Sequence, residues 1–269
     1  MKRVFPQEHW PASWHYSYLY DLQEIYGEHK SLGYTYAYQN RRRLTLQLLS
    51  EVLPAGSRVL DLAAGQGNFS LTMAEMGYDV TWNDLRADLA DYVRAKYEWG
   101  QLSFAPGNAF DLHLAQLFDA VLITEVIEHV AHPDQFLAST ARLVRPGGYI
   151  IMTTPNGEYC LNRLPKFSDC EDPSLFESVQ FAPDADGHIF LLHRDEVQAF
   201  AATTQLTIQR FTLFNNPLTS GHLKLRFLLT VLPEPLIRRI ERWCQLLPAA
   251  VVAKISTQMA VRFQVPSHV

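Results

Sequence analysis

The stretch 59–70, with the sequence VLDLAAGQGNFS, constrains the fold of this chain more than any other feature. It opens with a short run of valine and leucine, which is typical of a buried parallel strand. The acid Asp61 and a loop of small residues follow, and apolar residues then recur at helical spacing up to Gly77. Asn68 is placed to cap that helix. A strand, a glycine-rich loop and a helix in this order form the first unit of a nucleotide-binding α/β domain.

The details of the loop distinguish two classes of ligand. A dinucleotide-binding loop reads G-x-G-x-x-G and offers backbone amides to a pyrophosphate. Here the first glycine position is Ala63 and the third is Ser70, and the acid Asp61 would repel a pyrophosphate. An acid suits a ligand with positive charge, such as the amino group and the sulfonium of S-adenosylmethionine (SAM). The alternative is that Asp61 is only a turn residue at the end of the strand.

The sequence D-L-A-A-G-Q-G, which begins at Asp61, resembles the first motif of class I SAM-dependent methyltransferases, with Ala63 where the family usually has glycine. A second acid supports the same type of ligand. Residues 78–82 alternate as a second strand that leads to Asp84. An acid at the end of the second strand accepts both ribose hydroxyls in nucleotide-binding folds. The alternative role of Asp84 is to cap a helix expected over residues 87–99.

Two further positions follow the third and fourth strands of the expected sheet. Residues 102–105 form a strand that leads to Asn108, where many methyltransferases carry an aspartate bound to the adenine amino group. An amide oxygen accepts the same hydrogen bond. Residues 118–124 form a buried strand that runs into Glu125, which is placed to line the SAM pocket.

The order of the later elements extends the resemblance. A helix begins at Pro133, a turn follows at residues 145–148, and a fifth strand over residues 149–153 ends in T-P-N. The run resembles the ubiquinone-biosynthesis-like branch of class I methyltransferases over about residues 55–215. The resemblance implies an α/β fold, namely a Rossmann-like, seven-stranded, mostly parallel sheet flanked by helices. Its last strand, residues 259–265, is expected to be antiparallel at the edge.

The resemblance divides the chain into an N-terminal helical cover, residues 1–55, and a SAM-dependent methyltransferase domain, residues 56–269. The cover is rich in Trp and Tyr, and we expect helices over residues 13–26 and 38–53, broken at Gly27 and Gly33. In class I methyltransferases such an extension often covers the acceptor pocket. The alternative is that its aromatic residues only pack it onto the core.

Two additions are expected within the methyltransferase domain. Residues 157–187 are rich in Pro, Asp and Ser and predict an irregular, lid-like excursion. Residues 216–255 predict a helical insertion, with helices over 223–232 and 235–247, and residues 215–269 carry seven Lys and Arg but two Glu. These helices are candidates for peripheral contact with a membrane surface or an acceptor lipid. The alternative is an ordinary covering hairpin with a solvated basic face.

Composition narrows the partners and the compartment. The net charge of −5 gives no general attraction to nucleic acid, so no DNA partner is expected. The three cysteines lack the spacing of a disulfide framework or a zinc site, which favours a reducing, cytoplasmic location. No run approaches the ~18 apolar residues of a membrane span. The triplet Arg41-Arg42-Arg43 is expected to be a solvated helix face.

His129 follows the fourth strand and is the candidate general base for a hydroxyl or amine acceptor. The alternative is a structural histidine that packs the loop. Two carboxylates and two imidazoles occur in the order Glu125, Glu128, His129 and His188. This order resembles the metal-binding arrangement of small-RNA 3′-terminal 2′-O-methyltransferases. The acidic net charge and the R-P-G-G turn favour a metal-free enzyme of small molecules instead, so no metal is expected.

The resemblance implies transfer of a methyl group from SAM to a hydroxyl of a small molecule, a sugar or a lipid-linked intermediate, with His129 as the catalytic residue. The alternatives are a metal-dependent RNA 3′-terminal 2′-O-methyltransferase and a non-catalytic SAM-binding module, the latter because Ala63 and Asn108 depart from the family pattern. The residues expected to bind SAM are Asp61, Ala63, Gly65, Gly67, Asn68, Asp84, Leu85, Asn108, Ala109 and Glu125.

Overall fold

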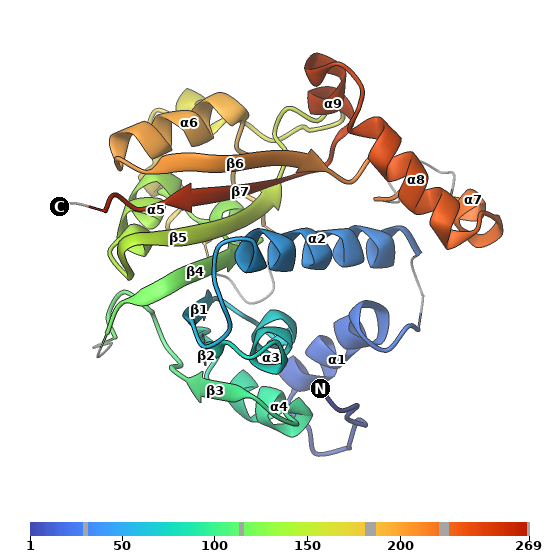
Figure 1. Cartoon of the computed structure of the whole chain (residues 1–269), viewed down its shortest axis with the longest axis vertical. Coiled ribbons are helices and arrows are strands. Elements are labelled where there is room, and N and C mark those ends of the chain that lie inside the picture. Colours follow the sequence, from blue (N-terminus) through green and yellow to red (C-terminus); the bar gives the residue numbers. More distant parts are fainter. Residues whose placement is uncertain (29–31, 113–115, 181–186, 221–225, 268–269) are drawn as a thin grey trace.

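The computed structural model describes residues 1–28, 32–112, 116–180, 187–220 and 226–267. Its centre is a seven-stranded sheet with the order β3-β2-β1-β4-β5-β7-β6, flanked by helices on both faces (Figure 1). The predicted fold class is confirmed. The strands are β1 (Arg58–Leu62), β2 (Asp79–Trp82), β3 (Gln101–Phe104), β4 (Phe118–Thr124), β5 (Val144–Pro155), β6 (Thr207–Phe214) and β7 (Gln258–Gln264).

Parallel pairing brings the predicted site residues to one edge of the sheet. β1 pairs in parallel with β2 and with β4, so that Asp61 lies beside Trp82 on one side and Leu122 on the other. β2 pairs in parallel with β3, and β4 with β5. The carboxyl ends of these strands therefore meet, and ligands of open α/β sheets bind at such an edge.

The last strand differs from the expectation in its place. β7 runs antiparallel, as predicted, but it lies between β5 and β6, so the edge strand is β6. The burial of the two strands explains this order. Met259, Val261 and Phe263 of β7 are fully buried, whereas Gln209 and Arg210 of β6 are exposed. An apolar strand gains from a place inside the sheet, and a polar strand tolerates an edge.

The helices form two layers. In Figure 1, α2 and α3 lie against one face of the sheet, and α5 and α6 lie against the other. Alternation along β4 explains both layers, since Val121 and Ile123 enter the core under α5 and α6, whereas Ala120 and Leu122 enter the core under α2 and α3. The helices are α1 (Ala12–Glu24), α2 (Leu32–Ser50), α3 (Asn68–Glu75), α4 (Leu89–Lys96), α5 (Pro133–Ala141), α6 (Arg194–Thr203), α7 (Arg226–Val231), α8 (Glu234–Cys244) and α9 (Ala249–Ile255). Within the described ranges, no helix combines the length and the apolar character needed to cross a bilayer.

Three local expectations are wrong. Gly33 lies in the first turn of α2 and does not break it, because the first turn depends least on intrahelical hydrogen bonds. The turn expected at residues 145–148 lies inside β5, where the N–H of Gly147 donates to the carbonyl oxygens of Val265 and Pro266. The basic C-terminal segment contains one more helix, α9, because Pro248 cannot continue α8 and starts a new helix.

The excursion after β5 is irregular, as predicted. Its described part contains two short 3-10 turns, Phe167–Asp169 and Pro173–Phe176. Phe167 and Phe176 each pack edge-on against the buried ring of Phe190, with ring centroids 5.4 and 5.3 Å apart. Residues 181–186 of the predicted excursion, and residues 223–225 of the predicted helix over 223–232, lie outside the described residues.

Candidate functional site

Asp61, at the carboxyl end of β1, is a buried acid, and only one of its two carboxylate oxygens accepts a side-chain hydrogen bond among the described residues. Its Oδ2 accepts a hydrogen bond of 2.5 Å from the hydroxyl of Ser70 in α3. Its Oδ1 is buried and has no hydrogen-bond partner among the described residues. Burial raises the pKa of Asp61 to about 7, with a smaller contribution from the nearby charge of Asp84. An orphaned buried oxygen of this kind fits the ammonium and sulfonium charges of SAM.

The glycine loop has the backbone that a close ligand requires. Ala63, Gly65 and Gly67 all have positive φ, at 55°, 52° and 72°. A Cβ at Gly67 would lie 2.7 Å from a methyl group of Val93, so only glycine fits there. Ala63 adopts the same left-handed region at a cost that a glycine at this position would avoid.

Asn68 does not cap α3, contrary to the expectation. It is the first residue of the helix, and Gly67 takes the cap position without a side-chain hydrogen bond. The amide of Asn68 instead donates to Asp21 at 2.8 Å and to Glu24 at 2.9 Å, and its oxygen accepts from Lys96 at 2.7 Å. The side chain of Asn68 is therefore bound to α1 and to α4.

Asp84, just past β2, is buried and accepts hydrogen bonds from the glycine loop and from its own turn. Its Oδ2 accepts from the N–H of Gly65 at 2.8 Å, and its Oδ1 accepts from the N–H of Arg86 at 2.9 Å. Asp84 is not the cap of the following helix, because α4 begins at Leu89. The guanidinium of Arg86 also binds the carboxylate, with its Nε 3.0 Å from Oδ1. Two ribose hydroxyls would have to share or displace this half-exposed arginine, whose part in the site the sequence did not reveal.

A cavity of about 330 Å³ lies beside the ends of β1, β2 and β4. It brings together four of the predicted residues, Ala63, Leu85, Asn108 and Ala109. Apolar side chains such as Val126, Val130 and Phe136 make up much of its wall, as expected for a pocket that holds a flat adenine ring. The oxygen of Asn108 accepts from the N–H of Phe110 at 3.2 Å, and its amide donates to Asp111 at 2.8 Å. Asn108 is thus positioned at the cavity by its own turn.

Glu125 follows β4 with a positive φ of 54°, a strained conformation for a glutamate. Its Oε2 accepts from Gln258 of β7 at 2.7 Å and forms an ion pair with Arg41 of α2 at 3.0 Å. The expectation of a solvated helix face is therefore wrong for Arg41, whereas Arg43 of the same triplet is exposed. The sequence could not show this contact, because Arg41, Glu125 and Gln258 come from three distant elements.

Glu128, His129 and His188 form a cluster whose ligand atoms all lie within 4.8 Å of one another. Glu128 is fully buried and accepts from the Thr154 hydroxyl at 3.0 Å. Burial and the neighbouring charge of Glu125 raise the pKa of Glu128 well above its usual range. These three groups could hold a divalent cation. Glu125, the fourth member of the predicted metal set, is not in the cluster and is paired with Arg41.

His129 has a defined orientation. Its Nδ1 lies 3.2 Å from the carbonyl oxygen of Gly187. Because a carbonyl oxygen can only accept, this hydrogen bond requires the proton on Nδ1, and Nε2 is then the acceptor atom of the neutral imidazole. The rings of His129 and His188 meet edge to face, with centroids 4.9 Å apart.

Helix α1 contacts the glycine loop directly, and α2 contacts the same glutamate of α1. Gln66 in the loop donates to Glu24 of α1 at 3.0 Å, and the Tyr34 hydroxyl of α2 donates to the same carboxylate at 2.5 Å. The loop is thus fixed on one side by Asp84 and on the other by α1.

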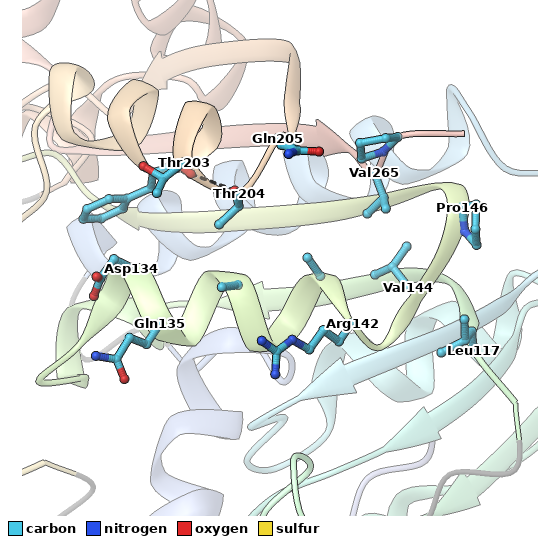
Figure 2. A pocket seen from close by; sticks show the side chains of 14 residues that line it. Leu117, Asp134, Gln135, Arg142, Val144, Pro146, Thr203, Thr204, Gln205 and Val265 are labelled. Carbon is cyan, nitrogen blue, oxygen red and sulfur yellow. Dashed lines mark hydrogen bonds between the residues drawn. The ribbon is translucent and has the colours of Figure 1, made fainter. Parts of the chain in front are cut away.

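A second, larger cavity of about 610 Å³ lies elsewhere, between α5 and α6 (Figure 2). Its lining includes Gln135 of α5 and Arg142 at the C-cap of that helix, and Thr203 and Thr204 at the end of α6 lie on the other side (Figure 2). Its wall contains none of the residues predicted to bind SAM. The smaller cavity is therefore the better candidate for the ligand, because it adjoins the glycine loop and the two acids.

Comparison with known proteins agrees with this geometry. A family model described as a methyltransferase domain matches residues 34–210. The ubiquinone biosynthesis O-methyltransferase of Xanthomonas axonopodis pv. citri (strain 306) is 38% identical over 116 residues, which are 42% of this chain and 46% of that protein. The protein of the same name from Caulobacter sp. (strain K31) is 32% identical over 181 residues, 61% of this chain and 65% of that protein. The chain thus spans about half to two thirds of these curated relatives.

Solved structures share the fold. The N-methyltransferase NodS from Bradyrhizobium japonicum WM9, in complex with S-adenosyl-L-homocysteine, matches with a TM-score of 0.51 at 15% identity, over 85% of this chain and 87% of that chain. The chain belongs to the methyltransferase domain family, a class of SAM-dependent enzymes with this Rossmann-like fold.

Proposed function

We propose that this chain transfers the methyl group of SAM to a hydroxyl of a small molecule, a sugar or a lipid-linked intermediate. The observation that carries the proposal is the pair of buried acids, Asp61 and Asp84, on either side of a glycine loop and next to an apolar cavity. The similarity to two ubiquinone biosynthesis O-methyltransferases supports oxygen as the acceptor atom.

The residues present have the chemistry that SAM requires. Asp61 offers its free Oδ1 to the positive charge of the cofactor, and Asp84 offers a carboxylate to the ribose. The cavity wall offers apolar surface to the adenine. When bound, SAM supplies a methyl group on a sulfonium, and positive charge is lost from sulfur as the methyl group moves to the acceptor. The chain contributes mainly by holding the two reactants in line, because correct positioning removes much of the barrier of such a displacement.

His129 is proposed to remove the proton of the acceptor hydroxyl. The Gly187 carbonyl holds the proton of the imidazole on Nδ1, so that Nε2 can accept a proton. Burial raises the pKa of Glu128 beside it, which disfavours the charged form of that carboxyl group. We also propose that the N-terminal segment of residues 1–55 packs over the glycine loop and covers the cofactor site. The hydrogen bond from Gln66 to Glu24 supports this proposal.

Substitution of His129 tests this role. His129→Ala should lower kcat about 10²–10⁴-fold, the usual contribution of a positioned base, while leaving the affinity for SAM nearly unchanged. The measurement is release of S-adenosylhomocysteine, paired with calorimetric titration of SAM. Activity of His129→Ala within a few-fold of the wild type would show that the residue is structural.

The same cluster has a second candidate role, because three potential ligands lie within 4.8 Å of one another. Glu128→Gln separates the two roles, since glutamine imitates a neutral carboxyl group but is a poor ligand for a cation. If His129 is a base without a metal, Glu128→Gln should stay active and EDTA should have no effect. If the cluster holds a divalent ion, EDTA should abolish activity, Mg²⁺ or Mn²⁺ should restore it, and Glu128→Gln and His188→Ala should be as damaging as His129→Ala.

The acceptor class is tested by a screen for S-adenosylhomocysteine release with hydroxyl, amine and carbon acceptors. Transfer only to amines or to carbon would refute the O-methyl proposal, and transfer only to an RNA 3′ end would favour the RNA alternative. SAM binding without turnover on any acceptor would indicate a non-catalytic module. We also propose a cytoplasmic location, which the three free cysteines support. A lipid-linked acceptor would require contact with a membrane, for which the C-terminal helices are the candidate.

A further inference from the structure

The helices between β6 and β7 carry an exposed apolar surface. α7, α8 and α9 lie beyond residue 210, where the methyltransferase family model ends, and in Figure 1 α7 and α8 project past the sheet at the side opposite the C-terminus. Trp243 is 56% exposed and Leu246 is 81% exposed. Further exposed apolar side chains of the same three helices and their turns are Val231, Leu236, Leu247 and Val251.

One side of α8 fixes the segment to the body of the protein, which leaves the other side free. Ile237 and Glu241 are buried. The carboxylate of Glu241 accepts from the N–H of Asn215 at 2.7 Å and from the Thr219 hydroxyl at 2.8 Å. Leu236, Arg239 and Trp243 follow one another at spacings of three and four residues, so they share the opposite, outward side of the helix.

Arginines accompany these apolar side chains. Arg239 and Arg242 are exposed, and neither has an ion-pair partner among the described residues. Arg242 also lines a cavity of about 220 Å³ together with Arg43 of α2 and Arg210 of β6, and the same cavity contains the two acids Glu51 and Glu241. The positive charge is local, since residues 215–269 carry seven Lys and Arg but two Glu, whereas the whole chain has a net charge of −5.

We propose that the outward side of α8, with Leu246 and Leu247 beyond its end, docks on a bilayer that contains anionic phospholipids. Tryptophan and leucine would enter the boundary between headgroups and acyl chains, and Arg239 and Arg242 would meet the lipid phosphates. A second copy of this chain is a poorer occupant, because a two-fold interface on this surface would place the unpaired arginines against one another. The inference does not depend on the methyl-transfer proposal, since it concerns a surface outside the cofactor site.

Flotation of the full-length protein with vesicles tests the proposal. Wild type should bind vesicles of phosphatidylcholine mixed with phosphatidylglycerol, and it should bind pure phosphatidylcholine at least tenfold more weakly. Trp243→Ala should weaken binding to the anionic vesicles by about tenfold or more, the effect of losing one large buried apolar side chain. Trp99→Ala is the matched control, because Trp99 is 58% exposed but lies between α4 and β3. It should bind as wild type does.

A variant and a matched control also test the role of the arginines. Arg242→Glu should weaken binding by at least about fivefold, the contribution of one arginine near an anionic surface. Arg142→Glu should not weaken it, because Arg142 is also exposed but lies at the end of α5. Equal binding by Trp243→Ala and Trp99→Ala, equal binding to neutral and anionic vesicles, or no binding at all would overturn the proposal. Analytical ultracentrifugation identifies the rival occupant, since a dimer that Trp243→Ala dissociates, together with absent vesicle binding, would make this surface an interface between copies.

Discussion

At position 63 the backbone adopts a conformation that glycine takes freely and alanine takes at a cost. Ala63 has a φ of 55°, and the same loop contains two glycines with positive φ. The left-handed region costs a residue with a Cβ about 1–2 kcal/mol. Ala63 therefore differs from the glycine of the first motif in its side chain, but its backbone adopts the conformation typical of glycine.

Two opposite substitutions test this interpretation. Ala63→Gly should stabilise the protein by up to about 1 kcal/mol, because relief of the strain outweighs the added freedom of the unfolded chain. Gly67→Ala should destabilise it by more than about 1 kcal/mol, because the new Cβ would lie 2.7 Å from Val93. Urea unfolding of both variants measures the two changes. A loss of stability in Ala63→Gly would contradict the account of the loop.

The pKa of Asp61 predicts how SAM affinity depends on pH. Burial raises this pKa to about 7, so most of the free protein carries a neutral Asp61 below pH 7. A cationic ligand favours the charged form, and affinity should therefore rise with pH between 5 and 7 and then level off. One pH unit below the pKa the loss is about tenfold. Titration calorimetry at several pH values measures the slope, and Asp61→Asn should abolish it. An unchanged slope in Asp61→Asn would show that another group titrates.

The same shift has a consequence for stability. A carboxyl group with a folded-state pKa above its unfolded value of 3.8 binds a proton more tightly when folded. Its stabilising contribution is complete below pH 4 and is lost as the pH rises toward 7. Above pH 7 the buried Asp61 carboxylate is charged and no longer stabilises the protein. Asp61→Asn should therefore raise the free energy of unfolding of the protein without cofactor, although the same substitution lowers the affinity for SAM.

At the scale of elements, a buried ion pair connects α1 to α4. Lys96 and Asp21 are fully buried with their charged atoms 2.7 Å apart. The Tyr92 hydroxyl donates to the same carboxylate at 2.7 Å, and Asn68 completes the cluster. Burial lowers the pKa of Lys96 while Asp21 opposes that shift. The cluster joins α1 to α4 and, through Asn68, to the start of α3.

Removal of one partner should be severe. Asp21→Ala leaves a buried lysine without its counter-charge and should lower the free energy of unfolding by about 3–5 kcal/mol. The exposed pair of Arg94 and Asp91 is the control, since Asp91→Ala should cost less than about 1 kcal/mol. Urea unfolding of both variants gives the comparison. Similar small losses in both would show that the cluster does not hold the cover.

Local sequence patterns predicted most elements but not the contacts between them. The run of residues 118–124 and the helix that starts at Pro133 have local signals, and the structure has both. The ion pair of Arg41 with Glu125 has no local signal, because the partners lie in α2 and beyond β4. Arg86 was missed for a different reason. A short-range contact of an arginine with a nearby aspartate does not differ in sequence from a solvated pair.

At the scale of the whole molecule, the order of the strands creates the site. Parallel pairing of β1 with β2 and β4 places Asp61 and Asp84 at one edge, next to Glu125 and the cavity. The motif order predicted this arrangement, since each acid follows its own strand. The place of β7 inside the sheet could not be read from β7 alone. It depends on the difference in polarity between β7 and β6, which is a comparison of two distant segments.

Calorimetric titration of the folded protein with S-adenosylhomocysteine and with SAM tests the central claim most directly. The wild type should bind both ligands, and Asp84→Ala should bind them at least about tenfold more weakly, because it loses the charged acceptor of two ribose hydroxyls. Circular dichroism of Asp84→Ala confirms that the variant is folded. Absence of binding by the folded wild type, together with tight binding of NAD, would contradict the assignment of this edge of the sheet to SAM.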